Sequence, residues 1–280
     1  MYLVGVTVKG MGLDAVRDLA GANLGDKHLL KMCAGMLARF RPDGDGLAET
    51  FRVEYQCLCS ILEDLKHGRA TLQGIQREMP YDEHGEQPLA MRFAYFWQLR
   101  LNETKRLLAD HMRTRIANAH RPYAERKTLD LVRLAYRTRE WVPAWVPWNR
   151  AGRLLLSMLE GHYGGLVSEK CCVSVRVEAL RARLVLQAFR AEHGRLPDRL
   201  DQLVPAYLDA VPRDDFDGRP LRYDPQKRVV YSVGKDLKDD GGMTQEEIDA
   251  WWHESQPEMA AEGGKPMPMD LPDPSWPIEF

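Results

Sequence analysis

The hydrophobic periodicity of this chain changes at Gly194, and this change constrains the fold more than any other feature of the sequence. Before Gly194, apolar residues recur at helical spacing. After it, residues 221–223 and 228–233 alternate in the manner of strands, and Pro225 at the second position of the connecting turn favours a hairpin. The sequence therefore predicts an α+β fold, with a mainly helical N-terminal domain followed by a small helix-plus-antiparallel-hairpin module.

Capping and turn residues divide the first part of the chain into helices. Leu13, Val16 and Leu19 fall at helical spacing. Asp26 is placed to cap the next helix, and Pro42–Gly46 is a turn cluster. Two prolines make Trp141–Trp148 a rigid aromatic linker. Asn149 is placed to cap a helix that ends before a break at Gly164-Gly165. The expected helices cover residues 29–37, 47–67, 89–120, 123–141 and 151–160.

The second part begins with a strong helix, expected over residues 169–192 with one apolar face and a left-handed cap at Gly194. A short helix is expected over 198–204. Thr244 and Glu247 form a capping box, which predicts a helix to about His253. From Glu254 the chain is rich in proline and is expected to be extended, with Trp276 and Phe280 fixing its end. The expected divisions are a helical domain over 1–165, an α/β module over 166–254 and a tail over 255–280.

The composition is that of a folded protein, with 44% hydrophobic and 29% charged residues. The net charge of −2 gives no reason to expect nucleic acid or an anionic membrane as a partner. No segment has the roughly 20 apolar residues of a membrane span. We expect a cell-envelope location if an anchor lies upstream of Met1, and a soluble chain otherwise. A protein partner fits either case.

Known catalytic and zinc motifs are absent from the sequence. The eight histidines are scattered without an H-E-x-x-H pattern, and there is no G-x-S-x-G, G-x-G-x-x-G or P-loop. The cysteine spacings do not suit structural zinc, so we expect buried free thiols. Asp214, Asp215 and Asp217 are candidates for paired catalytic carboxylates, but their position between Pro212 and Pro220 favours a turn. We therefore assign no catalytic residue and lean against an enzyme.

Five segments of the second part resemble the C-terminal half of the major, G-type pseudopilin of type II secretion systems. That family has a helix ending in N/H-G-R-Y-P, a P-x-D-P-W/F-G-x-P turn and a final S-L-G-x-D-G-x-x-G-G hairpin. The chain is also similar to bacterial proteins that carry this module behind a helical region. Arg176, Arg181, Arg183 and Arg190 exclude a membrane helix here. The segments are AFRAEHGRLP at 188–197, LDQLV at 200–204, VPRDDFDGRP at 211–220, YSVGKD at 231–236 and DGG at 240–242.

This resemblance implies a calcium site in the loop 234–242, because the corresponding loop of that family binds calcium. Asp236 and Asp240 are the implied side-chain ligands, Asp239 is a weaker candidate, and Ser232 or Val233 supplies a carbonyl oxygen. Carboxylate and carbonyl oxygens are the ligands that calcium prefers. Under this hypothesis, added calcium raises the melting temperature.

Two other interpretations of the loop stay open. Asp236, Asp240 and Glu247 match the first, fifth and last positions of an EF-hand loop, although Lys238 takes a ligand position and a strand precedes the loop. The other interpretation is a solvated turn that binds no metal.

Three functional hypotheses follow. The first is a non-enzymatic cell-envelope or secretion-related assembly protein, with calcium as its cofactor. The second is a helical protein-interaction scaffold, and the third is a carboxylate-dependent hydrolase.

Overall fold

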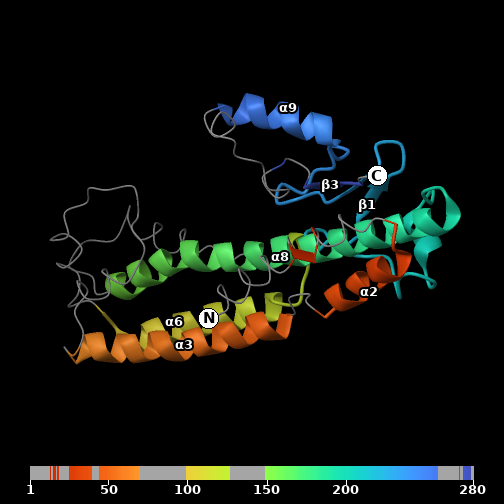
Figure 1. Ribbon diagram of the computed structural model, residues 1–280. Coiled ribbons are helices and arrows are strands. Elements are labelled where there is room, and N and C mark those ends of the chain that lie inside the picture. The colour runs from red at the N-terminus through yellow and green to blue at the C-terminus, as the bar shows by residue number, and fades with distance from the viewer. Residues whose placement is uncertain are drawn as a thin grey trace. The chain divides into compact units, whose positions relative to one another are not determined.

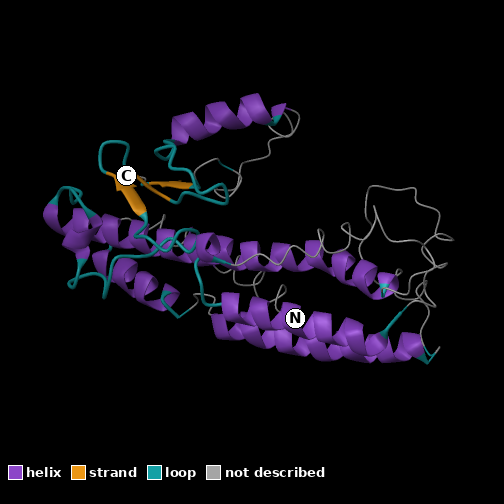
Figure 2. Ribbon diagram, turned by 180° about the vertical axis from the view of Figure 1, so that it is seen from behind, coloured by secondary structure: helices purple, strands orange, loops and turns teal. Residues whose placement is uncertain are grey.

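The computed structural model describes residues 13, 15, 16, 18, 25–39, 44–67, 69, 99–126, 149–257, 271 and 274–278, without the side chains of 150, 151, 154, 155 and 157–165. Two compact units make up the chain. Unit 1 comprises residues 1–43, 121–126 and 167–280, and unit 2 comprises 44–120 and 127–166. The domain divisions expected from the sequence stay a prediction. Figures 1 and 2 show the elements of both units.

Unit 2 contains two antiparallel helices, α3 (Gly44–Lys66) and α6 (Leu101–Asn118). Their direction follows from two side-chain contacts: Asp45 at the start of α3 lies 3.4 Å from His120, and Glu63 near its end bonds to Lys105. Phe51 and Met112 are buried. The helix expected over 47–67 is confirmed, but it begins inside the predicted turn cluster, because Gly44 and Gly46 are helical.

The helix expected over 89–120 does not continue through residues 99 and 100, and its described part is α6 from Leu101 to Asn118. Leu99 and Arg100 are not helical, and residues 89–98 lie outside the described part of the chain. The start of α6 is fixed by Asn149, whose buried Oδ1 accepts hydrogen bonds from Arg100 N (2.9 Å) and Thr104 Oγ (3.1 Å). Position 152 requires glycine for a steric reason, because a Cβ there would overlap Thr104 Oγ and lie 2.6 Å from Asn149 Oδ1. A long-range contact, not a local capping signal, therefore sets this boundary.

One 44-residue helix, α8 (Arg150–His193), replaces the two helices expected over 151–160 and 169–192. The predicted break at Gly164-Gly165 is wrong. A glycine inside a helix costs about 1 kcal/mol relative to alanine, which weakens a helix but does not end it. The left-handed cap is confirmed, because Gly194 has a φ of +73° and its N–H donates to Arg190 O at 2.7 Å.

Unit 1 has its core around the second part of α8, alongside α2 (Lys27–Leu37), whose cap at Asp26 is confirmed. Leu30, Leu37, Val177 and Leu184 belong to one buried cluster. Burial on α8 extends beyond the one apolar face that was expected from the sequence. Five polar side chains among the described residues of α8 are buried as well, namely Lys170, Ser174, Glu178, Arg183 and Gln187.

The hairpin after Gly194 is confirmed, with β1 (Arg222–Asp224) antiparallel to β2 (Val229–Tyr231). A third strand, β3 (Ser275–Pro277), pairs antiparallel with the other side of β2. The Pro-rich tail therefore contributes a strand to the sheet, which the sequence did not predict. Trp276 lies opposite Val230 and is 6% exposed, as its expected role in fixing the tail requires. Phe280 lies outside the described residues.

Three shorter elements of unit 1 also lie within the described residues. The capping box of α9 (Gln245–Ser255) is present as predicted. The short helix expected over 198–204 is a 3-10 turn, η3 (Leu200–Leu203). Only residues 123–126 of the helix expected over 123–141 are described, and they form a 3-10 turn, η2 (Tyr123–Glu125), followed by an extended Arg126. Residues 127–148, including the aromatic linker, lie outside the described part of the chain.

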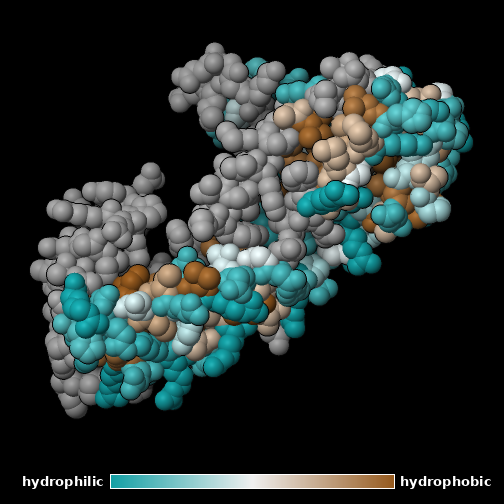
Figure 3. Space-filling model, turned by 60° about the horizontal axis from the view of Figure 1, so that its bottom comes forward, coloured by the Kyte–Doolittle hydropathy of each residue, from teal (hydrophilic) through white to brown (hydrophobic). Residues whose placement is uncertain are grey.

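The described structure is thus α+β, with most of its residues helical and one small antiparallel sheet. None of its described helices combines the length and the apolarity that a membrane crossing requires. On the face drawn in Figure 3, hydrophobic groups lie among hydrophilic ones. The large apolar side chains that stand exposed among the described residues are Met32, Met36, Val53 and Leu237.

Candidate functional site

Residues 212–220 form a closed turn, which we call the acidic turn because it carries Asp214, Asp215 and Asp217. The predicted turn is confirmed. Arg213 and Pro220 pair as an isolated bridge, and Asp214 N donates to Arg219 O at 2.7 Å. Gly218 has a φ of +76°, and a Cβ there would lie 2.7 Å from Pro122 Cγ, so glycine meets both a conformational and a steric need.

Asp214 is the most buried carboxylate of the acidic turn, with no exposed surface. Its oxygens accept hydrogen bonds from Phe216 N, Val233 N and Arg222 Nη1, each at 3.0 Å. Burial raises the pKa of Asp214, while the bonds from Phe216, Ser232 and Val233 oppose that rise. Because Val233 follows β2, this one carboxylate joins the acidic turn to the end of the hairpin.

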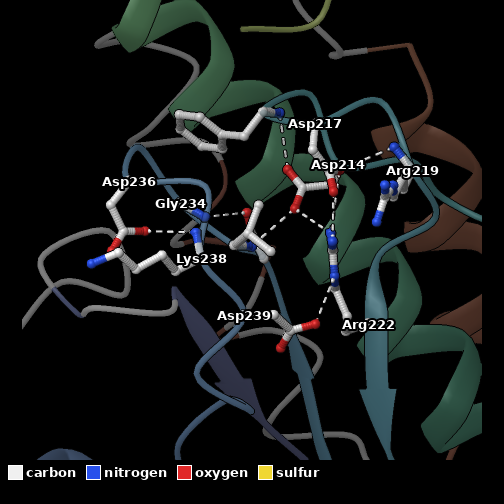
Figure 4. Close-up of polar contacts among 11 residues, drawn as sticks. Asp214, Asp217, Arg219, Arg222, Gly234, Asp236, Lys238 and Asp239 are labelled. Carbon is white, nitrogen blue, oxygen red and sulfur yellow. Dashed lines mark hydrogen bonds and ion pairs between the residues drawn. The ribbon is translucent and has the colours of Figure 1, made fainter. Parts of the chain in front are cut away.

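Arg222, on β1, pairs with three carboxylates, as Figure 4 shows. Its guanidinium lies 2.5 Å from Asp217 Oδ2, 3.0 Å from Asp214 Oδ2 and 3.5 Å from Asp239 Oδ2. Burial raises the pKa of Asp217, but the hydrogen bonds from Arg222 and Arg219 N and the charges of both arginines outweigh it, so the pKa is lowered. The Arg222 side chain is 15% exposed, so its contacts with Asp214 and Asp217 are little screened by water, whereas Asp239 is 50% exposed.

Asp215 connects the acidic turn to α8. Its Oδ2 accepts a hydrogen bond from Lys170 Nζ at 2.6 Å, and the two side chains are only 11% and 6% exposed. Its backbone oxygen accepts from Tyr123 N at 3.0 Å. A buried ion pair of this kind is stable only while both partners are present. Asp215 therefore holds α8 and η2 against the same turn.

Phe216 points into the core from between these carboxylates. It has no exposed surface and contacts Tyr123 edge to face, with ring centroids 5.7 Å apart. Its backbone oxygen accepts a hydrogen bond from Ala124 N at 2.8 Å. The acidic turn is thus held by apolar packing and by the ionic contacts of its three aspartates.

The side-chain ligands expected for calcium lie on the exposed loop 234–242. Asp236, Asp239 and Asp240 are all exposed. Asp236 Oδ1 accepts a hydrogen bond from Lys238 N at 3.2 Å, within the loop, whereas Asp239 pairs with Arg222. The structure therefore gives two of these carboxylates different partners.

The other predicted donors serve the backbone nearby. Ser232 and Val233 are buried, and Ser232 Oγ accepts from Gly234 N at 3.1 Å. Glu247 accepts from Thr244 N at 2.8 Å in the capping box and lies 3.5 Å from Lys227 Nζ. In the described part of the chain, no group of three or more His, Cys, Asp or Glu side chains is arranged to hold a metal ion. The calcium site stays a prediction.

The two residues that organise this site, Lys170 and Arg222, were not found by sequence reasoning. Lys170 lies on α8, 45 residues before its partner, and Arg222 looked like the polar position of an alternating strand. A signal did exist. Phe216 lies among the three aspartates, and its large apolar ring indicates that the turn packs against a core. Three aspartates within four residues of such a turn need positively charged partners, because buried charges are paired.

The five cysteines give a prediction about thiol reactivity. All are free; Cys33, Cys171 and Cys172 are buried as expected, but Cys57 is exposed and Cys59 is half-buried. Burial raises the pKa of Cys171 to about 12, which leaves almost no reactive thiolate near neutral pH. With a thiol reagent on the native chain, we expect fast labelling of Cys57, slower labelling of Cys59 and protection of the other three.

The count of labelled thiols, read by mass spectrometry, checks this. Unfolding in denaturant serves as the control, since all five thiols should then react. Fast modification of Cys171 in the native chain would contradict the packing of α8 described above.

Comparison with known proteins adds no assignment: no protein-family model, curated protein or solved structure matches the chain.

Proposed function

We propose that this chain is a non-enzymatic, secretion-related assembly protein of the cell envelope. In this proposal residues 166–254 form a pseudopilin-like module. The observation that carries the proposal is the acidic turn, whose three aspartates are all bound by other parts of the chain. They fasten α8 to the hairpin and the loop after it. A helix fastened to a small antiparallel sheet is the arrangement that the resemblance implies for such a module.

The same contacts favour a structural role over the hydrolase alternative. A catalytic carboxylate must reach the proton or atom on which it acts. Asp214 has no exposed surface, Asp215 is bonded to Lys170, and Asp217 is bonded to Arg222. These carboxylates are engaged in holding the fold.

A structural role also fits the character of the module. An assembly protein acts by associating with other subunits, for which a helix fastened to a sheet is sufficient. Neither a cofactor nor a catalytic group enters this proposal, and it does not depend on the predicted calcium ion.

Fractionation of the source cells tests the proposal. An antibody to the chain is used on cytosolic and envelope fractions, after treatment of intact cells with a lysine-reactive cross-linker. Lys235 and Lys238 on the exposed loop offer reactive amines. We expect the chain in the envelope fraction, in cross-linked species that contain a second copy or an envelope assembly protein. Recovery in the cytosolic fraction at the mass of one chain would overturn the proposal; a cytosolic marker enzyme controls for incomplete separation.

A further inference from the structure

The loop after β2 bends sharply and carries several charges. Four of its residues have positive φ angles: Gly234 (+64°), Leu237 (+62°), Gly241 (+93°) and Gly242 (+64°). A leucine in this conformation is uncommon and indicates that contacts elsewhere hold the loop in place. Asp236, Asp239 and Asp240 place three negative charges on this one segment. A loop of this kind needs an attachment to the body of the protein.

Arg222 provides such an attachment. It is rooted in β1, and its contacts reach the acidic turn on one side and the loop on the other (Figure 4). Nη1 and Nη2 bond to Asp214 and Asp217, while Nε lies 3.5 Å from Asp239. A guanidinium has five N–H donors in a fixed plane, so one side chain can pair with several carboxylates at once.

Beyond the proposed function, we propose that Arg222 is the built-in cation of this site: it fastens the loop 234–242 to the acidic turn, and the loop closes without a divalent metal. This differs from the calcium site that the resemblance implies. A cation fixed beside Asp239 stabilises the negative charge that calcium would otherwise neutralise. It also repels a second cation, which weakens metal binding at the same carboxylate.

A second arginine, Arg219, lies near Asp217 and allows the role of Arg222 to be tested. Arg219 adds its charge near Asp217, and its N–H donates to Asp217 Oδ1 at 3.0 Å. The Arg219 side chain itself is exposed. Arg219 therefore supplies positive charge without the buried contacts of Arg222, which makes it a matched control.

The test uses the full chain in three variants, Arg222→Gln, Arg222→Lys and Arg219→Gln. The melting temperature is measured with saturating calcium and with excess EGTA. In parallel, the rate of cleavage by a lysine-specific protease measures how often the loop opens, because Lys235 and Lys238 are exposed there. Neither Arg222→Gln nor Arg219→Gln adds or removes a lysine, so the cleavage sites stay the same in these variants. Arg222→Lys keeps the positive charge but lacks the planar guanidinium with its several N–H donors. It is the variant to be measured if Arg222→Gln does not fold.

For the wild-type chain, we expect the same melting temperature with calcium and with EGTA. Arg222→Gln should raise the rate of cleavage at Lys235 and Lys238 by about two- to fivefold, the effect on local opening of losing an ion pair whose carboxylate is half exposed. Arg222→Lys should show a smaller rise, and Arg219→Gln should cleave like the wild type.

Two results would overturn the inference: a calcium-dependent rise in the wild-type melting temperature, or equal cleavage of Arg222→Gln, Arg222→Lys and Arg219→Gln. Neither result depends on where the chain resides in the cell, so failure here is distinct from failure of the proposed function.

Discussion

Replacing Lys170 with methionine lowers the free energy of unfolding of unit 1 by about 3–5 kcal/mol, the usual effect of removing one partner from a buried ion pair. The reason is that the Asp215 carboxylate, 11% exposed, loses the ammonium 2.6 Å away and stays buried without this counter-charge. Methionine fills much of the lysine stem's volume, so the loss reflects charge more than packing. Amide hydrogen exchange of residues 171–193 measures the effect within unit 1.

A second variant separates the charge effect from a general loss of packing. Adding Asp215→Asn to Lys170→Met removes the unpaired charge, so the double variant should recover part of the lost stability. The exposed Lys238→Met serves as the matched control and should change stability by about 0.5 kcal/mol or less. A double variant less stable than Lys170→Met would show that Asp215 acts through other contacts.

Truncating Phe216 to alanine lowers the free energy of unfolding by about 3–5 kcal/mol, because a fully buried ring leaves a cavity that the neighbours fill only in part. The contact with Tyr123 is lost as well. Since Phe216 lies between Asp215 and Asp217, we expect their ionic contacts to loosen with it. Exchange of the Val233 and Ala124 amides, which bond to the acidic turn, should rise together.

Two comparisons make the Phe216 result specific. Phe216→Leu keeps most of the apolar volume and should cost clearly less than Phe216→Ala. Leu237→Ala removes an apolar side chain that is 40% exposed and should have little effect. A Phe216→Ala variant as stable as Leu237→Ala would contradict the placement of this ring in the core.

Local patterns predicted the elements whose signals lie within a few residues. The caps at Asp26, Gly194 and Thr244 and the hairpin around Pro225 follow from side-chain geometry close to the backbone they serve. The acidic turn was also predictable, since Pro, Asp and Gly favour turns for local reasons. These signals depend little on the rest of the fold.

The missed features depend on residues far apart in the sequence. β3 pairs with β2 through only three residues and contains a proline, so nothing in its own sequence marks it as a strand. The start of α6 at Leu101 is set by Asn149, which lies 49 residues from Arg100. The roles of Lys170 and Arg222 require knowing which segments meet around the acidic turn. Packing of this kind overrides local propensity.

The central claim is that the carboxylates of the acidic turn and of the loop 234–242 serve the fold through Arg222 and Lys170. A crystal structure of the full chain grown in the presence of calcium tests it most directly. We predict the Arg222 guanidinium among Asp214, Asp217 and Asp239, and Lys170 on Asp215. A calcium ion bound by Asp236 and Asp240, with Arg222 turned away from Asp239, would contradict the claim.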